Sequence, residues 1–331
     1  MAGAGAVAAA GLAAAGCGSR PAPSASAGQS LTPVSVQLTW LPQYQFAGYY
    51  VALKKGYYRQ EGLNVTIHPG GPGISSISAV ASGADTFGLA SPDQILVARS
   101  HGAPFEAILT DFQHSPTAFM VHAGSGIRSP RDFVGKTVAV NLGGNTQIEY
   151  EAMLAATGVN PASIHQVPVQ VSLTPFLTHR VNVWTVFVTD EPYLAEKAGQ
   201  KIRLIYPRTY GIDFYQDVLF ARRSTLRQEP QVARRFVAAT VKGWMYAIHH
   251  PRATDHLLMQ VNPKLTPGHL AYETRTTIPL IWDATTREHG FGYMDQARWN
   301  AIAQSLTRLK LLPGTAPAQG VYTDRFLPGP S

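Results

Sequence analysis

Strand-like and helix-like segments alternate along this chain from Val34 onward, and this order constrains the fold more than any other feature of the sequence. Residues 34–39, 64–68 and 86–90 have the alternating or continuous apolar pattern of β-strands, and segments of helical pattern separate them. Strands that alternate with helices are typical of α/β proteins with mostly parallel sheets. We therefore predict an α/β fold.

A second series of alternating elements follows the first. Its strands are expected at 136–141, 183–188 and 202–206. One more apolar strand, expected at 217–221, leads into a mostly helical remainder. Helices of this remainder are expected at 229–249, 251–259, 270–285 and 295–306.

Two series of strands, followed by a return strand and late helices, predict two α/β lobes that the chain crosses between twice. We place lobe 1 at residues 34–122 together with 218–331, and lobe 2 at residues 123–217. The crossings are expected near Ala123 and near Asp217. Ligands of such sheets bind outside the carboxyl ends of the strands, so the site is expected between the lobes.

The first 17 residues predict a signal segment. Residues 1–16 are Met, Ala, Gly, Val and Leu only, and Cys17 follows them. Small residues before a cysteine, after a short apolar run, resemble the lipobox of bacterial lipoproteins, in which that cysteine is lipidated. Residues 18–33 are rich in Pro, Ser, Ala and Gly and predict a flexible tether. We expect an extracytoplasmic protein held at the cell membrane by a lipid on Cys17; the alternative is a low-complexity tail.

The composition argues against a nucleic-acid-binding protein and excludes a fold held by intrachain disulfides. The 331-residue chain has a formal net charge of +7, and its Lys and Arg residues are spread along the sequence. Nucleic-acid binding usually requires a concentrated basic patch or a recognisable motif, and the sequence contains neither. Cys17 is the only cysteine, so an intrachain disulfide is impossible. We expect no nucleic-acid partner and a monomer.

An aromatic segment, residues 40–63, points to a planar ligand. It contains one Trp, five Tyr and one Phe around a short helical pattern. Aromatic rings beside the free N–H groups of a helix start suit a small, flat, polar molecule. Trp40 is the first candidate for stacking, with a core role as the alternative. Phe46 and Tyr49 flank the helix start, and we expect one of them to face the cleft and the other the core.

Polar residues after the other predicted strands complete the candidate site. Ser91 and Asp93 open a helix, where the N–H groups favour a polar ligand group, although simple capping is the alternative. Gln113 lies in the loop before the first crossing and is either a ligand contact or a turn residue. Asn145 and Thr146 follow two glycines, which allow a close approach of backbone to ligand.

Four more candidates lie in the second series. Glu191 follows an apolar strand and has the carboxylate needed to accept bonds from ring amino groups; a helix-start charge is the alternative. Tyr210, Asp213 and Tyr215 lie at the return crossing, where they are expected to close over the ligand.

The motifs of the chain resemble those of a known family. The run W-x-P-x-x-x-F-A-G-Y-Y-V-A-x-x-K-G-Y-Y-x-x-E-G-L begins at Trp40, and S-G-A-D-T-F-G-L-A, F-Q-H-S-P, S-P-R-D-F-V-G-K-T-V-A-V, D-E-P and Y-G-I-D-F-Y-Q-D-V-L-F follow it. Over residues 34–327 the chain resembles periplasmic solute-binding proteins of ABC importers. The group is the one with thiamine-precursor binders, alkylsulfonate binders and the yeast-type pyrimidine synthase.

The resemblance implies a type II periplasmic binding protein, with two lobes that close on a ligand, and an ABC permease as partner. The implied ligand is a small planar heterocycle, first a thiamine-related pyrimidine of the formylaminopyrimidine or hydroxymethylpyrimidine type. An alkylsulfonate or taurine binder and a riboflavin-type binder are the alternatives among binding proteins.

The enzyme of the group is the alternative from another class. The resemblance implies that such a hydroxymethylpyrimidine phosphate synthase needs a lysine that holds pyridoxal phosphate, a nearby histidine and an iron-binding cysteine run. Ala90 and Gln94 stand where the lysine and histidine would fall, residues 211–215 contain no cysteine, and Phe46 replaces a common histidine. We therefore expect no enzyme activity of this kind, no cofactor and no metal.

Overall fold

The computed structural model describes residues 1, 3–6, 8, 30–142, 144–170 and 172–329. Residues 31–331 form one compact unit, and residues 1–30 form a separate one. Cys17 and most of the predicted tether lie outside the described residues. The tether prediction extends slightly too far, because the first strand already begins at Thr32. Among the described residues, no helix is long and apolar enough to cross a membrane.

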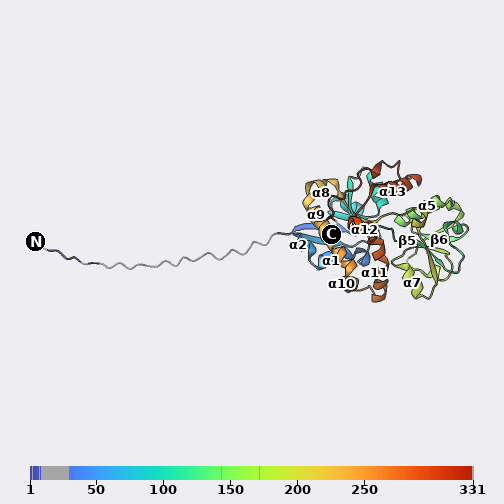
Figure 1. Cartoon of the computed structure of the whole chain (residues 1–331), viewed down its shortest axis with the longest axis horizontal. Helices are drawn as coiled ribbons and strands as arrows, with labels where there is room; N and C mark the ends of the chain where they lie inside the picture. The colour runs from blue at the N-terminus through green and yellow to red at the C-terminus, as the bar shows by residue number, and fades with distance from the viewer. Residues whose placement is uncertain (2, 7, 9–29, 143, 171, 330–331) are drawn as a thin grey trace. The chain divides into compact units, whose positions relative to one another are not determined.

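The first sheet has the strand order β2-β1-β3-β10-β4. It is separate from the second sheet, whose strands β5 and β6 are labelled in Figure 1. Its strands are β1 (Thr32–Gln37), β2 (Leu63–His68), β3 (Phe87–Ala90), β4 (Phe105–Phe112) and β10 (Gln216–Arg222). β1 pairs with β2 and β3 in parallel, whereas β10 runs antiparallel between β3 and β4.

The second sheet has the order β7-β6-β8-β5-β9 and repeats this pattern. Its strands are β5 (Thr117–His122), β6 (Thr137–Val140), β7 (His165–Pro168), β8 (Val183–Phe187) and β9 (Ile202–Ile205). Here β5 is the antiparallel strand, between β8 and β9. In each sheet, the antiparallel strand is the first one after a chain crossing. The prediction of two α/β lobes with mostly parallel sheets is confirmed.

The first crossing lies earlier than predicted. β5 pairs with β8 and β9, so the chain changes sheets between Phe112 and Thr117 and not near Ala123. The predicted range of lobe 1 wrongly includes residues 117–122, which form β5 of the second sheet. All six residues of β5 are buried, and a fully buried strand has the same apolar pattern in either sheet. The return crossing, residues 206–215, ends where β10 begins, close to the predicted position at Asp217.

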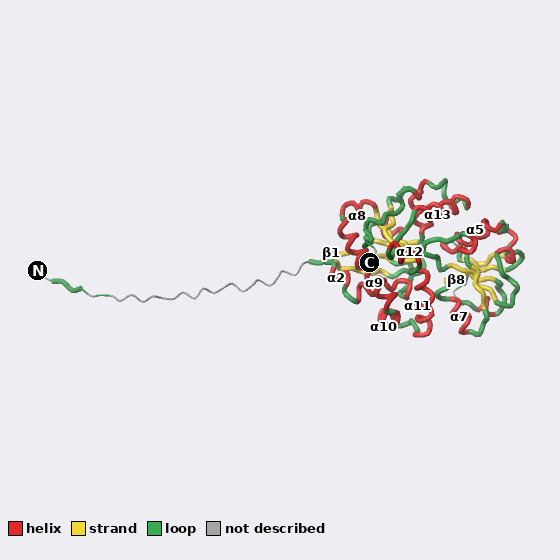
Figure 2. Tube along the Cα trace, in the orientation of Figure 1, coloured by secondary structure: helices red, strands yellow, loops and turns green. Residues whose placement is uncertain are grey.

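Helices cover both faces of the sheets (Figure 2). Around the first sheet lie α1 (Ala47–Lys54), α2 (Tyr57–Gln60), α3 (Ser76–Ser82), α4 (Pro92–Ser100), α8 (Arg223–Gln228), α9 (Pro230–His249), α10 (Pro251–Val261), α11 (Pro267–Ile281), α12 (Ala284–His289) and α13 (Gln296–Arg308). The second sheet carries α5 (Asn145–Thr157), α6 (Thr174–Leu177) and α7 (Glu191–Lys197). Short 3-10 turns lie at Tyr44–Phe46, Pro130–Phe133, Pro161–Ser163, Pro207–Tyr210 and Ala316–Ala318.

The core consists of two buried clusters, one on each face of the strands. Successive residues of β5 enter different clusters: Ala118 and Met120 belong to one, and Phe119 and Val121 to the other. Burial on both faces explains why the strands read as continuous apolar runs in the sequence.

One helix prediction is wrong in extent. The helix expected at 270–285 ends at Ile281, and α12 begins as a new helix after Asp283. The Asp283 carboxylate accepts a hydrogen bond from the Thr286 N–H at 2.9 Å, the usual geometry of a helix N-cap.

Candidate ligand-binding site between the two sheets

A buried carboxylate, Asp217, lies at the point where the return crossing enters β10. Its side chain is fully buried, and its φ of +50° places a non-glycine residue in the left-handed region. The Gln45 amide donates to Asp217 Oδ2 at 2.6 Å, and the Thr39 hydroxyl donates to Oδ1 at 3.0 Å. Backbone strain of this kind persists only where the surroundings enforce it, and it is concentrated at functional sites.

Burial shifts the pKa of the Asp217 carboxyl group. Loss of hydration raises the pKa of Asp217 to about 6, and its hydrogen bonds oppose that rise. At neutral pH the side chain is therefore largely a carboxylate, held in one orientation by donors from the loop and helix start that follow β1. A fixed, desolvated acceptor is suited to orienting a polar ligand.

A second hydrogen bond joins this network to the other lobe. The Asn145 amide, at the start of α5, donates to Gln216 Oε1 at 2.9 Å. Gln216 precedes Asp217 in β10, and its own amide faces Asp217 Oδ1 at 3.4 Å. Asn145, a residue singled out from the sequence, is thus linked across the lobes to the buried acid.

Trp40 directly follows a member of this network in the sequence and keeps much of its surface exposed. Its relative exposure is 43%, and it follows Thr39, whose hydroxyl binds Asp217. The Gly70 N–H donates to the Trp40 carbonyl at 2.9 Å, and a side chain at Gly70 would collide with the Thr39 carbonyl. The loop after β2 thereby fixes the backbone of Trp40 and leaves its ring accessible for stacking.

The starts of α4 and α5 form a second polar group. Ser91 and Asp93 lie at the start of α4, both buried, and burial raises the pKa of Asp93 to about 6. Helices α4 and α5 are in contact, and Thr146 and Glu149 lie buried in the first turns of α5. The sequence-predicted residues Ser91, Asp93, Asn145 and Thr146 therefore come from the starts of two helices, one from each lobe, that are in contact.

A third polar group joins the lobes at α7 and α11. His269 Nε2 lies 2.7 Å from Asp190 Oδ1, and the Tyr193 ring stacks on the imidazole at a centroid distance of 4.8 Å. Glu191, the sequence-predicted residue here, accepts the Phe187 N–H at 2.9 Å. Burial first, and the charge of Asp190 next, raise the pKa of Glu191 to about 8.

Phe46 and Tyr49 do not divide between cleft and core as predicted. Both are fully buried in the same hydrophobic cluster. The Tyr49 hydroxyl donates to Asp111 Oδ1 at 3.3 Å, and its ring meets Trp244 edge-on. Helix α1 packs tightly on α9, where a side chain at Gly243 would collide with the Gly48 carbonyl. Because α1 packs so closely on α9, both rings lie in the hydrophobic core and neither is left for the cleft.

The remaining predicted residues belong to the two crossings. His114 Nδ1, in the first crossing, lies 2.8 Å from Asp213 Oδ2 in the return crossing. Arg298 of α13 donates to the Gln113 carbonyl and lies 3.8 Å from the same Asp213 oxygen. The Tyr215 hydroxyl donates to Asp295 Oδ2 at 3.2 Å. These contacts tie Gln113, Asp213 and Tyr215 to the first lobe, and Tyr210 is half-buried against the second hydrophobic cluster.

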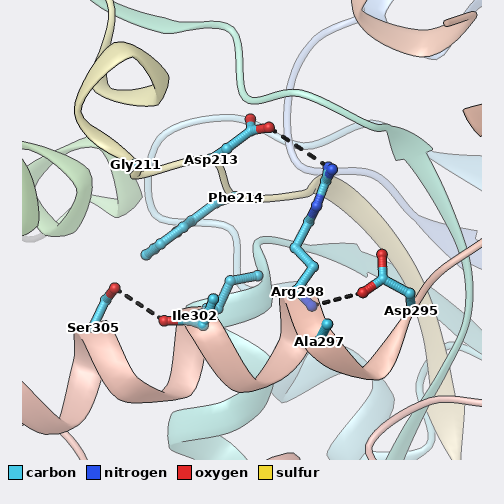
Figure 3. A pocket seen from close by; sticks show the side chains of 9 residues that line it. Gly211, Asp213, Phe214, Asp295, Ala297, Arg298, Ile302 and Ser305 are labelled. Carbon is cyan, nitrogen blue, oxygen red and sulfur yellow. Dashed lines mark hydrogen bonds and ion pairs between the residues drawn. The ribbon is translucent and has the colours of Figure 1, made fainter. Parts of the chain in front are cut away.

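A pocket of about 350 Å³ lies beside this group (Figure 3). It is lined by Gly211, Asp213 and Phe214 of the return crossing and by residues 295–305 of the α13 region. In Figure 3 the Asp213 carboxylate and the Arg298 guanidinium point toward each other along one side of the pocket. The pocket therefore lies at the crossings, whereas the Asp217 network lies at the start of β10.

Several residues of the site were missed from the sequence. They are Thr39, Gln45, Glu149, Asp190, Gln216, Asp217, His269 and Glu273. Two carried a usable signal. Asp217 is a charged residue at the edge of an apolar strand run, and Glu149 shares helical spacing with Thr146 and the buried Met153. His269 and Glu273 join the site only through the tertiary fold.

A family model described as NMT1/THI5 like matches residues 43–254. The chain belongs to this family. The match runs from just before the 3-10 turn at Tyr44–Phe46 into α10, so it includes the whole second sheet, β10 and both crossings. Thr39 and Trp40 lie before the matched residues, and His269 lies after them.

Three relatives match most of the chain. The riboflavin-binding protein RibY of Chloroflexus aurantiacus is 24% identical, over 94% of this chain and 90% of its own length. The formylaminopyrimidine-binding protein of Halalkalibacterium halodurans is 25% identical, over 84% and 86%. A 4-amino-5-hydroxymethyl-2-methylpyrimidine phosphate synthase of Legionella pneumophila is 26% identical, over 89% and 92%.

Solved structures support the fold assignment. The putative periplasmic sulfonate-binding protein SsuA of Methylobacillus flagellatus superposes with a TM-score of 0.68 at 16% identity, covering 90% of this chain and 93% of its own. At this identity the likeness concerns the fold alone. The NMT1/THI5-like chain therefore has the two-lobed fold of type II periplasmic binding proteins.

Proposed function

We propose that this protein is the substrate-binding component of an ABC importer and captures a small planar heterocycle that contains a pyrimidine ring. The observation that carries the proposal is the Asp217 network, in which a buried carboxylate is held by Thr39, the residue directly before the exposed Trp40. A flat heterocycle stacks on the ring while its polar edge meets carboxylate and amide groups.

The first ligand we propose is a thiamine-related pyrimidine of the formylaminopyrimidine or hydroxymethylpyrimidine type. Riboflavin is the second candidate, because the relative RibY matches 94% of this chain. The two ligand types share a pyrimidine ring that presents both donors and acceptors at its edge. Asp217, which is largely ionised at neutral pH, disfavours an alkylsulfonate or taurine because its negative charge would repel the sulfonate group.

Capture requires motion of the lobes about the crossings. Two contacts join the lobes: one between Asn145 and Gln216, and one between Asp190 and His269. Both contacts can form only when the two lobes are close together. Closure of this kind creates a surface that a permease can distinguish from the open form.

An enzymatic role on the same fold is the alternative, since one relative is named a synthase. Ala90 and Gln94 supply neither an amine for a Schiff base nor an imidazole, and residues 211–215 supply no thiolate. We therefore propose a binding protein without catalytic residues.

We also propose an extracytoplasmic location, with a lipid on Cys17 as the membrane anchor and a tether after it. The small residues before Cys17 and the binding-protein relatives support this part of the proposal. The protein is proposed to work as a monomer, because its two lobes provide both sides of the site.

The test is a ligand-induced thermal shift of residues 18–331 with formylaminopyrimidine, hydroxymethylpyrimidine, thiamine, riboflavin, taurine and pyridoxal phosphate. A ligand that binds only the folded state raises the melting temperature by mass action. A shift with a pyrimidine or with riboflavin, without turnover, supports the proposal and names the ligand. A shift with pyridoxal phosphate alone, accompanied by Schiff-base absorbance, would replace it with the enzyme.

A further inference from the structure

Glu149 lies in the second turn of α5, and only one of its two carboxyl oxygens receives hydrogen bonds from the described residues. Its relative exposure is 2%. The hydroxyls of Ser115 and Thr117 donate to the same oxygen, Oε1, at 2.6 and 2.7 Å. Both donors lie where the first crossing enters β5, so Oε1 is fully used by the crossing.

The other oxygen is buried and has no partner among the described residues. Glu149 Oε2 shares this condition with the hydroxyl of Thr146, whose relative exposure is 4%. Thr146 precedes Glu149 by three residues, so the two side chains lie on one face of α5, close to its N-terminus. Buried polar atoms without partners are rare in folded proteins, and two on one helix face require an explanation.

We propose that Glu149 and Thr146 form a ligand subsite that binds a hydrogen-bond acceptor on the polar edge of the heterocycle, a carbonyl oxygen or a ring nitrogen. The inference rests on the proposed function and assigns a role to an acid that the Asp217 network does not use. The helix start after β6 faces the side of the sheet where ligands of such folds bind. Helix α4 of the first lobe meets α5 there, so closure of the lobes encloses the subsite.

The charge state of Glu149 defines the ligand chemistry. Burial raises the pKa of Glu149 to about 8, and the nearby charges of Asp93 on α4 and Asp213 on the return crossing add to this rise. The hydroxyls of Ser115 and Thr117 act in the opposite direction. At neutral pH the group is therefore mainly the neutral acid. Since Oε1 already accepts two hydrogen bonds, the proton belongs on Oε2, which becomes a donor.

This arrangement selects one kind of ligand edge. A neutral acid donor beside a hydroxyl suits a carbonyl oxygen or an unprotonated ring nitrogen, as in a pyrimidine or the pyrimidine part of a flavin. A ligand without an acceptor at that position would leave the buried donor unpaired, which disfavours its binding.

The experiment measures the affinity of riboflavin and of formylaminopyrimidine by calorimetry, between about pH 6.5 and about pH 9.5. The full-length wild type is compared with Glu149→Gln, Glu149→Ala and Thr146→Val. Glu151→Gln and Thr157→Val, on the same helix, are the matched controls, since Glu151 binds Gln147 and Thr157 binds its own helix backbone. Circular dichroism confirms that each variant is folded.

The glutamine variant gives the decisive result. Its amide keeps an acceptor for Ser115 and Thr117 and a permanent donor in place of Oε2, so its affinity should stay within about threefold of wild type and lose its dependence on pH. Wild-type affinity should fall toward about tenfold per pH unit above the pKa of Glu149. Glu149→Ala should bind at least roughly tenfold more weakly, and Thr146→Val several-fold more weakly.

Other outcomes separate this inference from the proposed function. If the wild type binds a probe with the same pH profile as Glu149→Gln, or if folded Glu149→Ala binds as tightly as the wild type, the subsite is wrong and the binding function stands. If the wild type binds neither probe, the proposed function fails and the subsite fails with it.

Discussion

His269 of the first lobe and Asp190 of the second lie in direct contact, with 2.7 Å between Nε2 and Oδ1. The Tyr193 ring stacks on the imidazole at an interplanar angle of 11°, so the contact is held by stacking as well as by charge. The neighbouring residue Gly268 leaves room for Tyr193, since a side chain there would meet its hydroxyl. This pair joins α11 to the start of α7 and therefore bears on how the lobes close.

Closure should depend on pH through this pair. The hydrogen bond to Asp190 raises the pKa of His269 above its ordinary value of 6.5, and burial opposes the rise. The contribution of a group with a raised pKa is complete below the ordinary value and is lost as pH rises through the raised one. The ligand-free protein should therefore be more compact at about pH 5.5 than at about pH 8.5, as measured by small-angle X-ray scattering.

Variants test whether the His269–Asp190 pair causes this pH dependence of compactness. Asp190→Asn should give the more open form at both pH values, and His269→Gln should behave in the same way. His165→Gln, at an exposed position of β7, is the control. Glu191 and Glu273, whose pKa values burial raises to about 8, are the other titrating groups near His269. An unchanged pH profile in Asp190→Asn would assign the effect to these acids.

Asp217→Asn should destabilise the fold while keeping its backbone. Asparagine tolerates the left-handed conformation that Asp217 adopts, so strain is not added. One carboxylate oxygen becomes an NH₂ group, however, and then faces the donor of either Gln45 or Thr39. The loss should be about 1–3 kcal/mol in the free energy of unfolding, measured with a denaturant. Equal midpoints for variant and wild type would show that the network does not depend on the charge.

Cys17→Ser tests the proposed anchor independently of the ligand. A lipidated cysteine adds apolar chain that holds a protein at the membrane, and serine cannot be lipidated in the same way. When cells are fractionated, the variant should appear in the soluble fraction and not in the membrane fraction, and its ligand affinity should be unchanged. Membrane association that persists in the variant would remove the lipoprotein interpretation.

The strand and helix pattern predicted the fold class and most elements, because strands and helices here have clear apolar periods. The 20-residue helix α9, for example, differs from its predicted range by one residue. The membership of β5 was not predictable in this way. Its apolar pattern defines a buried strand, and only the tertiary pairing with β8 and β9 decides which sheet contains it.

The site was predicted less completely for a related reason. Position after a strand makes Trp40, Asn145, Thr146 and Glu191 candidates, since the carboxyl ends of parallel strands share one edge. Aromatic residue type gives a wrong prediction at Phe46 and Tyr49, because both rings are buried in the core around the start of α1. The acids Asp217 and Glu149 carry a pattern signal in the sequence, but the full burial that makes them functional candidates is evident only in the structure.

Trp40→Ala tests the stacking on which the proposed function depends. The relative exposure of Trp40 is 43%, so removal of its ring should leave the melting temperature nearly unchanged, and Leu41→Ala, at the neighbouring exposed position, is the matched control. Stacking of a heterocycle on an aromatic side chain is worth about 1–3 kcal/mol, which corresponds to a roughly 5- to 150-fold weaker affinity in the variant. Calorimetry with riboflavin and formylaminopyrimidine measures it, and quenching of tryptophan fluorescence by the ligand should decrease in parallel. If Trp40→Ala binds like Leu41→Ala, the ligand does not stack on Trp40, and the site must be sought among the buried acids and amides alone.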